Sequence, residues 1–111
     1  MNVRIKSSLL DIYQSIDEIF IFLGARRKFS EYHSDIKTNK AVERNLEIIG
    51  EAVNRILKEA PDFLLDQAKN IVGTRNRIIH SYDNISDEVL WTIVVRDLPK
   101  LKVQVEQLLS E

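Results

Sequence analysis

The stretch VRIKSSLLDIYQSIDEIFIFL, residues 3–23, decides the fold class because its apolar residues recur at every third or fourth position. The stripe consists of Ile5, Leu9, Ile12, Ile16, Ile19 and Leu23. This spacing follows the 3.6-residue period of the α-helix, so the segment is predicted to form a helix with one apolar face. Gly24 follows directly and is a suitable C-cap, because glycine accepts the left-handed conformation that ends many helices.

Two further helices are predicted downstream. Residues 38–59 carry a second apolar stripe, and Gly50 lies in its middle. Glycine inside a helix costs about 1 kcal/mol relative to alanine, so we expect a close helix–helix approach at this position. A third helix is predicted over residues 61–80, with Pro61 in its first turn, where proline is well tolerated.

A fourth helix is predicted to start at Ser86, whose hydroxyl can cap the first turn. Its apolar stripe continues to the C-terminus, but Pro99 lies inside it, so a kink or break is expected near residue 95. Residues 25–37 are expected to be a connection with some helical turns. The chain is therefore predicted to be all-α, an antiparallel bundle of four to five helices forming a single domain over residues 1–111.

Composition limits the classes of function. The chain has 111 residues, of which 44% are hydrophobic and 30% charged, which is typical of a soluble globular protein. It has no cysteine, which excludes disulfides and thiolate chemistry. No apolar run is long enough to span a bilayer and the start does not resemble a signal peptide, so we expect a cytoplasmic protein without a membrane partner. The net charge of −1 means that binding to RNA would depend on a local patch.

No metal or other cofactor is predicted. The two histidines, His33 and His80, are far apart in the sequence and lack a nearby carboxylate cluster at ligand spacing. Three glutamates do recur at helical spacing, at Glu43, Glu47 and Glu51. They lack the Glu-x-x-His pattern of di-iron bundles, which favours a solvated helix face or an interface.

The segment TRNRIIHSYD, residues 74–83, gathers the residues that could carry chemistry at the end of the third helix. Asn76 and His80 are i, i+4 neighbours, so their side chains can touch. Arg75 and His80 are about 140° apart on an ideal helix. The length of the arginine, the end of the helix or a second subunit must therefore bring them together.

An imidazole and a guanidinium suffice for RNA cleavage without a metal. Histidine takes and gives protons near neutral pH, and an arginine fork holds phosphate oxygens as charge develops. Arg77 and Lys69 on the same helix are candidate contacts to RNA phosphates. An arginine and a histidine at this spacing also arise by chance, so a structural role for the pair, in capping or at an interface, remains an alternative.

The same segment resembles the Arg-x4-His-x-Tyr motif of the HEPN-domain, HepT-like toxin family. The matching residues are Arg75, His80 and Tyr82. Residues 46–52, LEIIGEA, resemble the second-helix signature of the family, and residues 96–101, RDLPKL, resemble its fourth helix with an internal proline. Together these segments cover three of the four predicted helices.

The resemblance implies a HEPN-type bundle that forms a homodimer, with the motifs of both subunits facing one cleft. It implies a metal-independent endoribonuclease toxin of a type VII toxin–antitoxin system, with an RNA substrate and an MntA-type nucleotidyltransferase antitoxin as partner. Arg75 would bind phosphate, His80 would transfer protons, Asn76 would support His80, and Tyr82 would receive the AMP that silences the toxin. A non-catalytic HEPN module that binds a nucleotide or a protein, and a purely structural helical dimer, are the alternatives.

Overall fold

The computed structural model describes residues 2–24, 28–65, 68–80 and 86–111, with the side chains of all of these but residues 68, 69, 79 and 80. Every regular element in these ranges is a helix. The helices are α1 (Val3–Leu23), α2 (Phe29–Ser34), α3 (Ile36–Glu59), α4 (Ala68–His80), α5 (Asp87–Thr92), the π-helix η1 (Ile93–Asp97) and α6 (Leu98–Leu109). The prediction of an all-α protein is confirmed.

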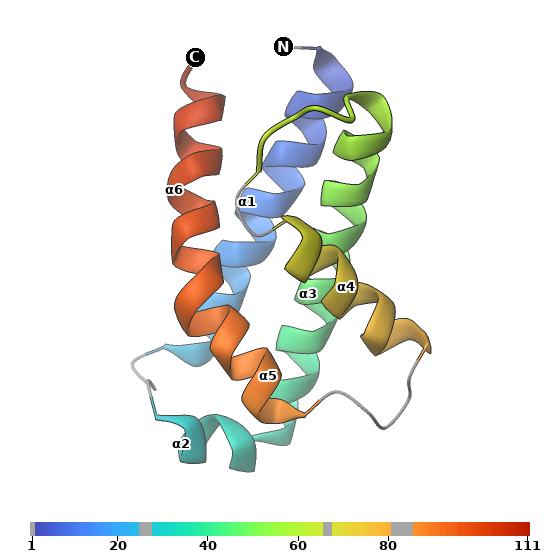
Figure 1. The fold of residues 1–111 in the computed structure, drawn as a ribbon. Coiled ribbons are helices and arrows are strands. Elements are labelled where there is room, and N and C mark those ends of the chain that lie inside the picture. Colours follow the sequence, from blue (N-terminus) through green and yellow to red (C-terminus); the bar gives the residue numbers. More distant parts are fainter. Residues whose placement is uncertain (1, 25–27, 66–67, 81–85) are drawn as a thin grey trace.

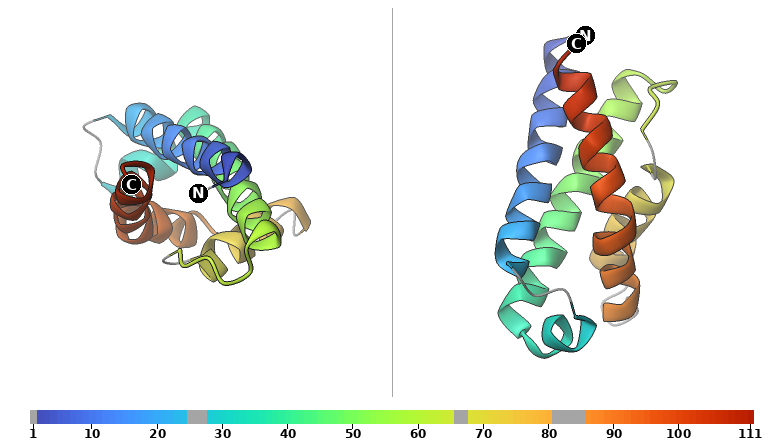
Figure 2. Two further views of the ribbon diagram at one scale, coloured as in Figure 1. Left: turned by 90° about the horizontal axis from the view of Figure 1, so that it is seen from above. Right: turned by 90° about the vertical axis from the view of Figure 1, so that its left-hand side faces the viewer.

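The long helices alternate in direction and form the predicted antiparallel bundle (Figure 1). α1 runs away from the N-terminus, α3 returns, α4 runs away again, and the continuous run α5–η1–α6 leads back, so both chain ends lie at one end of the bundle. The short α2 lies at the opposite end (Figure 2). α1 packs against α3 and α6, whereas α4 packs principally against α3. The position of α4 is therefore set by its contact with α3.

The apolar stripes predicted from the sequence form the hydrophobic core. Every residue of the α1 stripe is 7% exposed or less. In the last helical run, five apolar side chains are each 0% exposed: Leu90, Val94, Leu98, Leu101 and Val105. Burying a side chain of this size contributes about 1.5–3 kcal/mol, so these stripes supply most of the force that holds the helices together.

The two helix caps predicted from the sequence, at Gly24 and Ser86, are present. Gly24 has φ +58° and its N–H donates to the Phe20 carbonyl, which makes it the C-cap of α1. The Ser86 hydroxyl accepts a hydrogen bond from the Val89 N–H and caps α5. The expected connection between the first two long helices contains the one-and-a-half-turn helix α2.

The prediction of a helix over residues 61–80 is wrong in its first part, because α4 begins only at Ala68. Pro61 lies instead at the second position of a turn in which the Phe63 N–H donates to the Ala60 carbonyl. Proline is favoured there because its φ is already fixed. The segment then stays non-helical as far as Leu65, which is 8% exposed and packs into the core.

The interruption predicted near residue 95 is present as the π-helix η1. Pro99, in the first turn of α6, has no N–H to donate to the carbonyl of residue 95, and its ring would clash with that carbonyl in a regular α-helix. A π-helical turn widens the backbone and relieves both problems. Its consequence is that Arg96 and Asp97 lie at a change of helical register.

Candidate active site

α4 approaches α3 most closely where Gly50 meets Arg75. A Cβ placed on Gly50 would lie 2.9 Å from Cγ of Arg75 and closer still to its Cβ, and 3.1 Å from the Ile71 carbonyl oxygen. No side chain fits this gap, which explains the glycine in the middle of α3 and confirms the predicted close helix–helix approach. The stem of Arg75 is thereby held against the α3 backbone.

The guanidinium of Arg75 is half-buried and only partly engaged. Its Nη1 donates to Oδ1 of Asn76 over 3.1 Å. Its Nε is buried and has no hydrogen-bond partner among the residues that the structure describes. A buried N–H without an acceptor costs about 1–3 kcal/mol.

Asn76 lies between Arg75 and the end of the helix. It is exposed, accepts the hydrogen bond from Arg75, and sits one turn before position 80, the last residue of α4. The side chains of His80 and Lys69 are outside the described part of the structure, and so is the whole of Tyr82. Of the predicted site residues, the structure thus brings Arg75 and Asn76 together, and the roles of all of them stay predictions.

Arg77 faces a different side of α4. It is exposed and lines a groove of about 400 Å³ between α4 and the α5–η1 run. Four residues of α4 and four of the facing run line this groove at the spacing i, i+3, i+4, i+7. They are Asn70, Gly73, Thr74 and Arg77 on α4, and Val89, Thr92, Ile93 and Arg96 opposite, with Asp97 beside Arg96. The sequence analysis missed Arg96 as a site residue.

Arg96 is anchored by a buried carboxylate. Its Nε and Nη2 donate to the two oxygens of Asp97 over 2.8 and 3.3 Å. The side chain of Asp97 is 0% exposed, whereas that of Arg96 is 57% exposed. The hydrogen bonds that Arg96 donates to this carboxylate raise the pKa of Arg96. The arginine therefore keeps its charge, and its side chain lines the groove.

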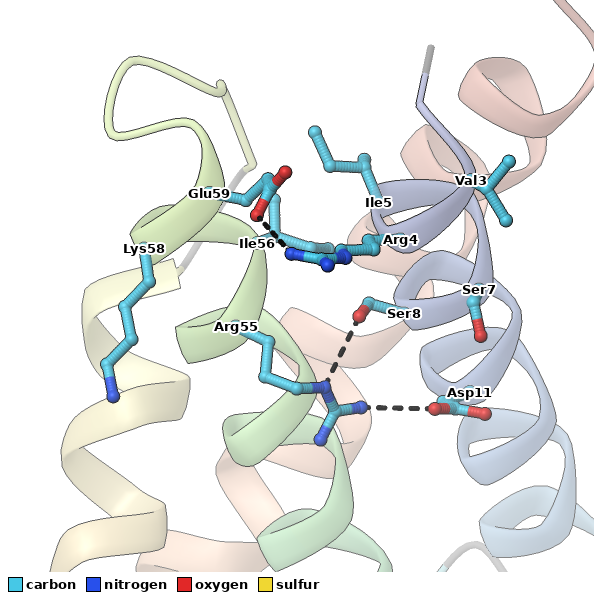
Figure 3. A pocket seen from close by; sticks show the side chains of 10 residues that line it. All are labelled: Val3, Arg4, Ile5, Ser7, Ser8, Asp11, Arg55, Ile56, Lys58 and Glu59. Atoms are coloured by element: carbon cyan, nitrogen blue, oxygen red, sulfur yellow. Dashed lines mark hydrogen bonds and ion pairs between the residues drawn. The ribbon is translucent and has the colours of Figure 1, made fainter.

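A larger cavity, of about 750 Å³, lies between the start of α1 and the end of α3 (Figure 3). Arg55 crosses it to donate to Asp11 over 3.1 Å and to the Ser8 hydroxyl over 3.4 Å, and Arg4 lies 3.8 Å from Glu59. Each arginine here thus has an acidic partner at close range. Arg75, Asn76 and Arg77, the predicted site residues whose side chains the structure describes, do not line this cavity, so we interpret its polar contacts as ties between α1 and α3.

His33, the histidine outside the motif, is on the surface. His33 Nδ1 lies 2.7 Å from Oδ2 of Asp87, and the imidazole stacks on Phe29 with 5.4 Å between ring centroids. Its side chain is 61% exposed. The contact joins α2 to the start of α5 at the end of the bundle opposite the chain termini.

The described residues contain no group of three or more histidine, cysteine or acidic side chains placed to hold a metal ion. None of their helices has the length and apolar character that crossing a bilayer requires.

Comparison with known proteins identifies the family. Residues 9–108 match the family of HepT-like ribonucleases. A protein of Methanocaldococcus jannaschii that is named as an RNase is 31% identical over 96% of this chain and 88% of its own length. A protein of Thermococcus cleftensis named as a ribonuclease HepT is 35% identical over 93% and 94%, respectively. No solved structure matches. Since the match covers nearly the whole sequence, the chain belongs to the HepT-like ribonuclease family.

Proposed function

We propose that this protein is a metal-independent endoribonuclease toxin of the cytoplasm, active as a homodimer, with Arg75 and His80 as its catalytic residues. Its partner would be a nucleotidyltransferase antitoxin of the MntA type, which transfers AMP to Tyr82. The observation that carries the proposal is the half-buried Arg75, whose Nε has no acceptor among the described residues. Membership in a ribonuclease family supplies the class of substrate.

Arg75 suits the phosphate group of RNA for a physical reason. Its stem is held at Gly50, so the guanidinium loses little conformational freedom when it binds a ligand. A phosphate oxygen would satisfy the orphaned Nε, and a neighbouring N–H of the same fork can reach a second oxygen. Negative charge grows on these oxygens in the transition state, where the fixed positive charge becomes most effective.

The cleavage step needs only proton transfer and charge stabilisation. The imidazole of His80 takes the proton of the ribose 2′-hydroxyl, and the 2′-oxygen attacks the adjacent phosphorus. The bond from phosphorus to the 5′-oxygen breaks, and an imidazolium returns a proton to that oxygen. The products are a 2′,3′-cyclic phosphate and a 5′-hydroxyl end. A homodimer that faces two motifs into one cleft offers an imidazole for each of the two proton transfers.

The catalytic assignment is tested with purified protein and a labelled RNA, with EDTA present throughout. Arg75→Ala and His80→Ala are each expected to lower the cleavage rate by about 10²–10⁴-fold, the usual range for a lost acid–base or electrostatic group. Arg44→Ala is the matched control, because Arg44 is an exposed arginine of α3 that pairs with the neighbouring Glu47. Folded Arg75 and His80 variants that cleave like the parent would remove these residues from the mechanism.

The regulatory assignment has a separate test. We co-express the chain with a nucleotidyltransferase of the MntA type and measure the intact mass of the chain. One or more AMP increments are expected, and they should disappear in Tyr82→Phe. Adenylylation adds bulk and negative charge beside the motif, so it should weaken RNA binding by like-charge repulsion. AMP increments that persist in Tyr82→Phe would place the modification elsewhere.

The dimer is tested by light scattering at several concentrations, with and without RNA. A mixture of Arg75→Ala and His80→Ala subunits adds a functional readout. If both subunits contribute to one cleft, the mixture should regain activity that neither variant has alone. RNA binding by the parent protein without cleavage would instead support the alternative of a non-catalytic module.

A further inference from the structure

We propose that the groove between α4 and the α5–η1 run binds the sugar–phosphate backbone of single-stranded RNA and guides it to the active site. This inference rests on the proposed ribonuclease function and adds a binding subsite to it. The groove has a volume of about 400 Å³ and carries two arginines, Arg77 on α4 and Arg96 on η1. It is too small for a duplex and suits an extended strand.

The charge of the groove favours phosphate. Asp97 is the acidic residue in its lining, and its fully buried side chain is already bonded to Arg96. That bond engages two of the five N–H donors of the guanidinium and fixes its orientation. The side chain of Arg96 is 57% exposed, so a phosphate oxygen can approach its guanidinium.

Thr92, the exposed one of the two threonines that line the groove, favours ribose. The Thr92 hydroxyl donates its hydrogen to the Glu88 carbonyl over 2.9 Å. It therefore presents only lone pairs to the groove, and Thr92 is exposed. The 2′-hydroxyl of ribose can donate a hydrogen bond to such an oxygen, whereas deoxyribose has no hydroxyl donor at that position. The geometry thus gives the groove a means to prefer RNA over DNA.

The rest of the lining favours the backbone over the bases. Among the described residues that line the groove there is no aromatic ring on which a base could stack. Gly73 contributes no side chain, and a Cβ added to it would have no atom within 4 Å. Contacts to phosphate and sugar position a strand without reading its sequence, so the groove should be tolerant of sequence.

The helical register links the groove to the motif. Positions 70, 73, 74 and 77 form the α4 side of the groove. Position 80 comes three residues after position 77, so it lies on the same face of the helix. A strand that follows this stripe of α4 therefore leads toward the end of the helix where His80 lies. Arg75, on another face of α4, is not part of the groove lining.

The test measures the binding of a short labelled RNA of mixed sequence by fluorescence anisotropy, in a His80→Ala background that prevents cleavage. The first variant combines Arg96→Gln with Asp97→Asn, so that no buried carboxylate is left without its partner and the net charge is unchanged. Its matched control combines Arg44→Gln with Glu47→Gln, which removes an exposed ion pair of 3.2 Å on α3. The second variant, Gly73→Gln, fills the groove and leaves the Arg96–Asp97 pair intact.

The first variant should bind RNA about tenfold more weakly than the parent, and Gly73→Gln should do the same without loss of stability. In the first variant, the slope of log K against log salt should also fall by about 0.7, the value for one phosphate contact to a single strand. Thr92→Val should weaken binding to RNA but not to the matching DNA. The control pair should change none of these quantities.

The inference would be overturned if both groove variants bound RNA with the affinity and the salt dependence of the parent protein. This would hold even if Arg75→Ala and His80→Ala abolish cleavage as proposed. The inference would also fail if the groove variants changed only the oligomeric state, which would assign the groove to a protein contact. Conversely, weaker RNA binding in both groove variants would support the groove even if Arg75→Ala left cleavage unchanged.

Discussion

Gly50→Ala is the substitution for which the structure makes the sharpest prediction. The added methyl group would lie 2.9 Å from Cγ of Arg75 and 3.1 Å from the Ile71 carbonyl oxygen, both closer than ordinary van der Waals contact. Overpacking of this kind costs about 1–3 kcal/mol, while replacing a helical glycine by alanine returns about 1 kcal/mol. The net free energy of unfolding should therefore fall by roughly 0–2 kcal/mol.

The effect on activity should exceed the effect on stability. α4 can only relieve the contact by moving Arg75 away from α3, and a displacement of about 1 Å can cost on the order of 10²-fold in rate. We expect the cleavage rate constant to fall by about 10–100-fold in protein that is still folded at the assay temperature. Urea unfolding followed by circular dichroism and a cleavage assay under single-turnover conditions measure the two quantities.

Gly73→Ala is the matched control for stability, because it makes the same change on a helix with open space around it. It should raise the free energy of unfolding by about 0.5–1 kcal/mol. A double-mutant cycle of Gly50→Ala with Arg75→Gly should show coupling, since the steric conflict needs a side chain at both positions. If Gly50→Ala stabilised the protein as much as Gly73→Ala and kept full activity, the close approach of α3 to α4 could not be what positions Arg75.

Three further substitutions test other parts of the fold by urea unfolding. Tyr32→Phe should raise the free energy of unfolding by about 1 kcal/mol, because the buried hydroxyl has no hydrogen-bond partner among the described residues. A decrease in the free energy of unfolding of similar size would instead show that the hydroxyl does have a hydrogen-bond partner. Ser86→Ala removes the cap of α5 and should cost about 1 kcal/mol, whereas Ser7→Ala on the exposed side of α1 should change little. Asp11→Asn breaks a half-exposed ion pair with Arg55 and should cost at most about 1 kcal/mol, an effect that should shrink in high salt; a larger, salt-independent loss would contradict our interpretation of that cavity.

The helices could be predicted where the local pattern and the tertiary packing favour the same structure. The residues of the α1 stripe recur with the helical period, and all of them are buried in the core. The bounds of α1 were therefore predictable to the residue. Pro61 shows the opposite case, because proline is equally suited to the first turn of a helix and to the second position of a turn. The choice is made by contacts that the local sequence does not contain, such as the hydrogen bond from Gln104 on α6 to the Leu64 carbonyl.

The site was predictable to the same degree. Arg75 and Asn76 are sequence neighbours, so their association needs only one helix. Arg96 becomes visible as a groove residue only when η1 is placed opposite α4, and a π-helical turn shifts the register on which a sequence pattern would depend. Gly50 is an intermediate case. The free-energy cost of a glycine inside a helix indicates that another helix packs closely there, but it does not indicate which helix.

The near-neutral net charge need not oppose binding to RNA, because the relevant charges are those that face the strand. The acidic side chains at the larger cavity and on α3 have basic partners nearby, as in the pairs of Arg55 with Asp11 and of Arg44 with Glu47. The groove differs, since Asp97, the carboxylate among its described lining residues, is fully buried and orients the guanidinium of Arg96. The electrostatic attraction of a few oriented N–H donors acts at short range and weakens with salt. We therefore propose that RNA contacts two faces of α4: one is fixed to α3 at Gly50 and carries Arg75, and the other forms the wall of the groove.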